Sequence, residues 1–73
     1  MNGTPYIVNM ESSEDAPRIA MAGGAFEVRS IRVGVDEDGQ RWRYTSSRYE
    51  YPDGFTFYGA DRDFVKLEGE NAQ

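Results

Sequence analysis

Residues 31–45, which read IRVGVDEDGQRWRYT, predict a β-hairpin. Apolar side chains occupy every second position of residues 31–35, and Trp42 and Tyr44 alternate in the same way, as is typical of half-buried strands. The acidic residues between the two runs suit the early positions of a turn, and Gly39 can adopt the positive φ that closes it. With a four-residue loop at 36–39, the opposed pairs are Val33 with Trp42, Ile31 with Tyr44, and Arg32 with Arg43.

The alternation changes parity on both sides of this hairpin. Phe26 and Val28 occupy even positions, whereas the apolar residues of 31–35 occupy odd ones. A similar change occurs at residues 46–47, before the tyrosines that follow. A slip of one residue moves every side chain to the other face of a strand, so each change predicts a bulge or bend, the first near residues 29–30.

A second turn is predicted at residues 51–54, which read YPDG. Pro52 suits the second position and Gly54 the fourth position of a type I turn followed by a bulge. This geometry sets Tyr51 near Phe55 and Tyr49 near Phe57.

The rest of the chain supplies short flanking elements. Residues 5–10 alternate as a first strand, and residues 11–17 read as a polar connection, because Pro17 disfavours helix in the residue before it. Residues 59–63 suit one helical turn that Asp61 caps. The expected limits are a last strand at 64–68, a single domain over 4–68, and flexible termini at 1–3 and 69–73.

These elements predict an all-β fold, either a small, strongly bent antiparallel sheet or a small barrel of five to six short strands. A chain of 73 residues has room only for a thin core. Four tyrosines, at positions 6, 49, 51 and 58, exceed what that core needs, and one or two of them are expected to be exposed. The expected core aromatics are Phe26, Trp42, Tyr44, Phe55, Phe57 and Phe64.

Residues 26–67 resemble an SH3-like small β-barrel. The resemblance lies in the acidic hairpin that ends at Gly39, in the aromatic strand 41–44, and in the polar turn 60–63 that leads into residues 64–67. The chain has no Ala-Leu-Tyr-Asp-Tyr-like signature and no paired tryptophans. The resemblance therefore implies the barrel fold but not the recognition of proline-rich peptides.

Catalytic chemistry has little support in the composition. The sequence contains no cysteine and no histidine, which removes thiolate nucleophiles, imidazole bases and the commonest zinc ligands. The acidic turn does not match a calcium loop: with Gly39 at the sixth position, Gly34 and Thr45 fall where an aspartate and a bidentate glutamate are required. We therefore expect no enzyme activity, no metal and no cofactor.

Arginines are concentrated in the middle of the chain, where five of the eight cationic residues lie between positions 29 and 48. Two interpretations are open. Either Glu27, Glu50 or another carboxylate neutralises these arginines in ordinary surface ion pairs, or the arginines form a docking surface with the neighbouring tyrosines, because Arg and Tyr concentrate binding energy at interfaces. The candidate binding residues are Arg29, Arg32, Arg41, Arg43, Tyr49 and Tyr51, together with Asp36, Glu37 and Asp38 of the acidic turn.

The function expected from these features is that of a protein-interaction module. Thirteen acidic and eight basic residues give a net charge of −5, which favours a larger, basic partner protein. The size, acidity and lack of catalytic groups resemble anti-CRISPR and other DNA-mimic inhibitors of phages and mobile elements. The alternative is binding of RNA or single-stranded DNA by the arginines with Tyr44 or Tyr49, against which the net charge stands.

No targeting or membrane-spanning segment is recognised. Residues 1–5 have no basic region followed by an apolar run, and nowhere are eighteen apolar residues consecutive. A cytoplasmic protein without membrane contact is expected. The protein is expected to be a monomer, or a homodimer that pairs through an open strand edge at residues 6–10.

Overall fold

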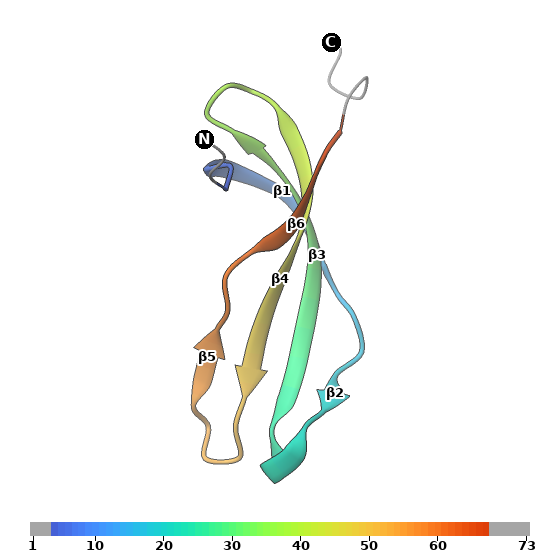
Figure 1. The fold of residues 1–73 in the computed structure, drawn as a ribbon, viewed down its shortest axis with the longest axis vertical. Coiled ribbons are helices and arrows are strands. Elements are labelled where there is room, and N and C mark those ends of the chain that lie inside the picture. The colour runs from blue at the N-terminus through green and yellow to red at the C-terminus, as the bar shows by residue number, and fades with distance from the viewer. Residues whose placement is uncertain (1–3, 68–73) are drawn as a thin grey trace.

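The computed structural model describes residues 4–67, which form one antiparallel sheet with no α-helix (Figure 1). The prediction of an all-β, strongly bent antiparallel sheet is confirmed, and over this range the sheet is not closed into a barrel. The elements in chain order are β1 (Ile7–Asp15), β2 (Ile19–Ala20), a 3-10 turn η1 (Ala22–Gly24), β3 (Phe26–Asp36), β4 (Arg41–Glu50), β5 (Thr56–Tyr58) and β6 (Arg62–Lys66).

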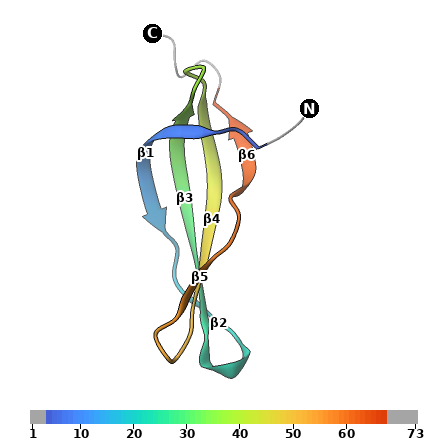
Figure 2. The same ribbon diagram turned by 90° about the vertical axis from the view of Figure 1, so that its left-hand side faces the viewer.

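The long hairpin of β3 and β4 is the spine of the molecule. It is flanked by β1 and β6 at the end that carries the β3–β4 turn, and by β2 and β5 at the opposite end (Figures 1 and 2). We call these the hairpin end and the aromatic end. β1 and β2 both pair with β3, and β5 and β6 both pair with β4. The six strands therefore form a four-stranded meander in which each of the two edge strands is interrupted once.

Both breaks lie at the same level of the sheet. The Ala16 N–H donates to the Arg29 carbonyl at 2.8 Å, and the Gly59 N–H donates to the Ser47 carbonyl at 2.9 Å. Arg29 and Ser47 are themselves a cross-strand pair. Pro17, which has no N–H to donate, lies within the first break, between Asp15 at the end of β1 and Ile19 at the start of β2.

The β3–β4 pairing contains no bulge, so the prediction that a bulge takes up each change of parity is wrong. The register continues without a shift from Phe26↔Glu50 to Val35↔Arg41. Even-numbered residues of β3 and β4 share one side of the sheet, here called the even face, and odd-numbered residues share the odd face. The predicted bends assumed that all apolar residues lie on one face, whereas this single-layer sheet carries apolar residues on both.

The hairpin register also differs by one residue from the prediction. Asp36 donates its N–H to the Gln40 carbonyl at 2.9 Å, and Gly39, with φ of +82°, donates to the Asp36 carbonyl at 3.0 Å. The loop is therefore a three-residue turn with a glycine bulge rather than the four residues 36–39. As a result, Arg32 is opposite Tyr44 and Arg43 is opposite Val33, so the two arginines lie on different faces.

Packing is concentrated on the even face of the hairpin end. Tyr44 is buried and stacks on Phe64 at 5.0 Å between ring centroids. At this end β1 crosses in front of β3 and β4 in Figure 2. Trp42 meets the edge of the same Phe64 ring at 6.2 Å. Gly34 lets β1 approach, because a Cβ there would lie 2.6 Å from the Ile7 Cγ2.

The rest of the expected core is more open than predicted. Within residues 4–67 only Ala25, Val28 and Tyr44 are buried apolar residues. Phe26, Phe55 and Phe57 are exposed, which corrects their assignment to the core, because no second layer covers the sheet that carries them. Of the four surplus tyrosines, three are exposed rather than one or two, namely Tyr6, Tyr51 and Tyr58.

Two local predictions are also corrected. Residues 11–15, predicted as a connection, belong to β1, because they pair with β3 at its edge. Residues 59–63 contain no helical turn: Arg62 pairs with Thr45, and Asp63, at φ of +59°, falls at a register shift between β6 and β4. The last strand thus begins at residue 62. Its predicted end at Glu68 and the predicted termini, 1–3 and 69–73, lie outside the described residues.

Candidate functional site

The second turn organises a group of exposed rings at the aromatic end. The Tyr51 N–H donates to the Phe55 carbonyl, and the Gly54 N–H to the Tyr51 carbonyl, both at 2.9 Å. Gly54 has φ of +93°, and Asp53 accepts the Phe55 N–H at 3.0 Å. The predicted turn with a bulge at Gly54 is confirmed by this hydrogen-bond pattern. The ring centroids lie 6.0 Å apart for Tyr51 and Phe55 and 6.1 Å apart for Tyr49 and Phe57, as predicted.

These rings share the odd face with two aliphatic side chains. Ile19, Glu27, Tyr49 and Phe57 lie side by side across four strands. In the next row the Met21 N–H donates to the Ala25 carbonyl at 2.9 Å. We define the aromatic surface as the five large side chains of this face that lie at the aromatic end and expose between 41% and 58% of their area: Ile19, Met21, Tyr51, Phe55 and Phe57.

A shallow groove of about 560 Å³ lies on the side of the aromatic surface that borders the second turn. Tyr51, Pro52, Asp53, Phe55 and Phe57 line it, so that one carboxylate stands beside apolar walls. At the aromatic end the described residues form a single layer, and no other element covers this face there (Figures 1 and 2). Contiguous exposed apolar area of this kind marks interaction surfaces on soluble proteins.

The predicted arginine surface is not assembled. Arg32 lies on the even face and donates to the Ser13 hydroxyl at 3.2 Å, whereas Arg29, Arg41 and Arg43 lie on the odd face. Arg29 pairs with Glu27 at 3.0 Å, and the hydrogen bond to that carboxylate raises the pKa of Arg29. Arg41 pairs with the Glu11 carboxylate at 2.9 Å.

Neutralisation by internal carboxylates is confirmed for much of the cluster. Glu50 pairs with Arg48 at 3.1 Å and with Arg18 at 2.7 Å. The hydrogen bond from Arg48 is the main reason that the pKa of Glu50 is lowered. The Arg18–Glu50 pair is exposed and the Arg48–Glu50 pair is part-buried, and ion pairs at the surface add little to stability. Arg43 is exposed, with no ion pair to another residue of 4–67.

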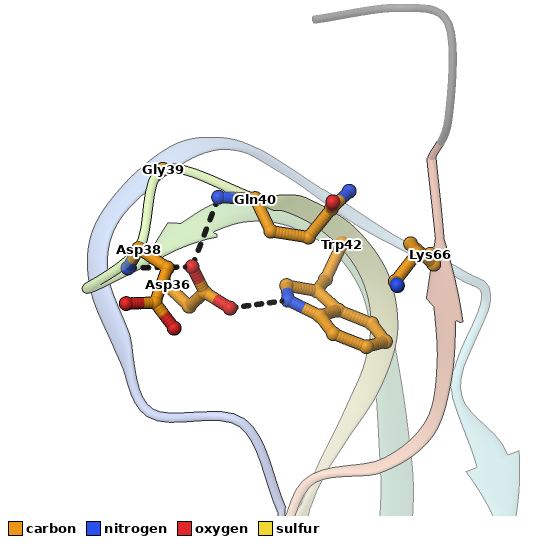
Figure 3. Close-up of a pocket in the computed structure, with 6 residues that line it drawn as sticks. All are labelled: Asp36, Asp38, Gly39, Gln40, Trp42 and Lys66. Carbon is orange, nitrogen blue, oxygen red and sulfur yellow. Dashed lines mark hydrogen bonds between the residues drawn. The ribbon is translucent and has the colours of Figure 1, made fainter.

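The acidic turn has a structural role at its first residue. Asp36 accepts the backbone N–H groups of Asp38 and Gln40, both at 2.9 Å, and the Trp42 indole N–H at 3.0 Å (Figure 3). The indole hydrogen bond is the largest cause of the lowered pKa of Asp36. Glu37 and Asp38 are exposed. The polar pocket of about 410 Å³ beside them is lined by Asp36, Asp38, Gly39, Gln40, Trp42 and Lys66.

Buried hydroxyls at the level of the breaks form a group that sequence analysis missed. Ser30 donates to the Asp15 carboxylate at 2.6 Å, and Arg62 donates to the Ser47 hydroxyl at 2.8 Å. Their partners come from the outer strands, so these bonds tie the edges to the spine. Among the described residues, no group of three or more carboxylates is arranged to hold a metal ion, and no helix is long and apolar enough to cross a membrane.

Of the predicted site residues, Tyr51 belongs to the aromatic surface, and Tyr49 and Arg29 lie at its border on the same face. The other predicted arginines and the acidic turn lie elsewhere. Sequence analysis missed Ile19, Met21, Phe55 and Phe57 as surface residues. The available signal was that both rings after the second turn share a face with the two tyrosines before it. Comparison with known protein families, curated proteins and solved structures found no match to this chain.

Proposed function

We propose that this protein is a non-enzymatic interaction module that docks onto a larger protein through the aromatic surface. The observation that carries the proposal is the uncovered cluster of Tyr51, Phe55 and Phe57 beside Ile19 and Met21 on one face of a single-layer sheet. Aromatic side chains held in a water-excluding cluster are the residues that dominate binding energy at protein interfaces.

The rings are ordered before any partner arrives. A turn hydrogen bond joins the backbones of Tyr51 and Phe55, which flank the second turn, and each ring has a neighbouring ring about 6 Å away. A surface that is already in its bound conformation loses less side-chain entropy on association. The ordered rings therefore support a docking role for the aromatic surface and not merely incidental exposure of apolar side chains.

Charge favours a basic partner. The chain carries a net charge of −5, and the exposed Asp53 lies in the groove among the rings. Aromatic faces also attract guanidinium and ammonium groups, as Arg18 above the Phe26 ring illustrates at 4.9 Å. A partner segment that combines apolar side chains with Arg or Lys would match both features.

A more specific form of this proposal is that the protein is an inhibitor of the phage or mobile-element type, and that it binds a basic protein that handles nucleic acid. The support for it is the size and acidity of the chain. We place the function in the cytoplasm, because the chain has no cysteine that an oxidising compartment would pair.

The proposal is tested by comparing two substitutions on the same strand. Phe57 points to the aromatic surface, whereas Tyr58 pairs with Arg48 on the even face and is 71% exposed. Proteins retained by the wild-type chain from its source cell are expected to be lost with Phe57→Ser and kept with Tyr58→Ser, after circular dichroism has shown that both variants fold. Retention of the same proteins by Phe57→Ser would overturn the proposal.

The nucleic-acid alternative has less support, because Arg29 and Arg41 are paired with carboxylates and Arg32 lies on the opposite face. An oligonucleotide titration distinguishes the two functions. The interaction module shows no binding at low salt, whereas a nucleic-acid binder shows affinity that falls steeply as salt is added.

A further inference from the structure

We propose that, when no partner is bound, a second copy of this chain covers the aromatic surface, so that the free protein is a face-to-face homodimer. This inference rests on the proposed function, because it concerns the same surface. It adds that partner binding is an exchange in which the second copy is displaced.

The first argument is the missing layer. A sheet with an apolar face is stable in water when that face is buried against another element. Here the described residues form one sheet with a radius of gyration of 14.4 Å, where a compact domain of this length has about 11 Å. A second sheet packed face to face, at the usual separation of about 10 Å, supplies the layer that one copy does not have.

The second argument is the area that the surface offers. Aromatic side chains bury about 150–250 Å² each when fully enclosed. With the observed exposed fractions, Tyr51, Phe55 and Phe57 offer roughly 300 Å² on this scale, and Ile19 and Met21 bring the total to roughly 450 Å² per chain. A stable interface buries about 800 Å² per partner, of which about 56–65% is apolar. The aromatic surface thus supplies the apolar portion that a standard-sized dimer needs.

The third argument is that charges at the two borders of the surface complement each other. Asp53 is exposed at the turn, and Arg29 and Arg62 lie at the level of the strand breaks, where both pair with Glu27 and keep side chains 48% and 41% exposed. From Ser47, the pairing partner of Arg29, β4 continues for three residues to Glu50, which is about 10 Å of strand, and Asp53 lies in the turn that follows. A two-fold axis through the middle of the surface places each Asp53 near Arg29 and Arg62 of the other copy, as an isologous interface requires.

The open edge of β1 is the competing route to a dimer, but its features disfavour strand pairing. The β1–β3 register shifts twice, between Ile7 and Asn9 and between Met10 and Ser12. Acidic side chains follow along the same strand at Glu11, Glu14 and Asp15. Irregular register and charge are the devices by which edge strands avoid pairing with other chains.

Sedimentation equilibrium of the purified full chain over a range of concentrations tests the proposal. The expected result is a wild-type species of twice the 8.3 kDa chain mass. Phe57→Ser, and independently Phe55→Ser, should weaken dimerisation at least about 30-fold, the loss expected at an interface hot spot. Tyr58→Ser, on the opposite face of β5, should leave the dimer unchanged.

A wild-type chain that stays monomeric up to about 1 mM would overturn the proposal. So would a dimer that resists both phenylalanine substitutions and is dissociated by Met10→Pro in β1, because the contact would then be the strand edge. Failure of the proposed function is distinguishable from these results. In that case the phenylalanine-dependent dimer forms, but the proteins captured from the source cell do not depend on Phe57.

Discussion

Gly34→Ala tests how β1 packs over the spine. A Cβ at position 34 would lie 2.6 Å from the Ile7 Cγ2, 3.1 Å from the Asn9 carbonyl oxygen and 3.5 Å from the Tyr44 ring. Overpacking of this kind costs about 1–3 kcal/mol. Against it stands the gain of about 0.5–1 kcal/mol that alanine has over glycine inside a strand. We expect a net destabilisation of about 1–2 kcal/mol, which corresponds to a decrease in Tm of about 5–15 °C for a domain of this size.

The assay is thermal unfolding followed by circular dichroism, in a double-mutant cycle with Ile7→Ala. Ile7→Ala removes the closest of the three contacts, the Ile7 Cγ2. The cost of Gly34→Ala should therefore fall by about 1 kcal/mol in the Ile7→Ala background. The reasoning is refuted if Gly34→Ala raises the Tm, or if its cost is the same with and without the Ile7 side chain.

Three further predictions concern the hairpin end. Hydrogen bonds, the largest contribution being that of the Trp42 indole, lower the pKa of Asp36 in the folded state. The ionised Asp36 therefore stabilises the fold fully above the pKa of the unfolded state, and this stabilisation is lost as the pH falls through the pKa of the folded state. The Tm should fall below about pH 4, and Asp36→Asn should show a shallower fall in scans from pH 7 to pH 2; parallel curves would contradict this. Gly39→Ala should lower the free energy of unfolding in urea by about 1–2 kcal/mol, because the φ of +82° is unfavourable for alanine; the added Cβ itself meets no atom within 4 Å. Gly39→Asn should lower it less, and equal stability of the wild type and both variants would argue against this turn. Phe64→Ala should cost about 2 kcal/mol and shift Trp42 fluorescence to the red, since it removes a half-buried ring from Tyr44 and Trp42; an unchanged emission spectrum would count against the ring cluster.

Both turns were predictable from sequence, but the strand register was predicted correctly only for the second turn. The segments DEDG at 36–39 and YPDG at 51–54 adopt the same hydrogen-bond pattern, each with a glycine at positive φ. The bulge was predicted for the second and not for the first. Because side chains alternate between faces, that single residue was enough to place Arg32 opposite Arg43 instead of Tyr44.

The polar half of β1 could not be recognised from alternation. Residues 11–15 contain no apolar side chain, and their strand conformation depends on β3. Asp15 accepts from Ser30, and Ser13 accepts from Arg32. These partners lie 15 and 19 residues away along the chain, beyond the reach of a local pattern.

The candidate site was half predictable. The second turn predicts that Tyr49, Tyr51, Phe55 and Phe57 share a face, and the structure agrees. Which face is covered depends on whether a second layer packs on it, and alternation carries no information about that. The phenylalanines were therefore assigned to a core that a single-layer sheet does not form.

The central claim is that the aromatic surface, and not the hairpin end, is where this protein meets another polypeptide. A photo-crosslinking amino acid placed at Phe55, which is 58% exposed, should give an adduct with a second copy or with a partner protein in the source cell. The same probe at Tyr6, which is 70% exposed at the hairpin end, should give none. Equal adducts from both positions, or an adduct from position 6 alone, would contradict the claim.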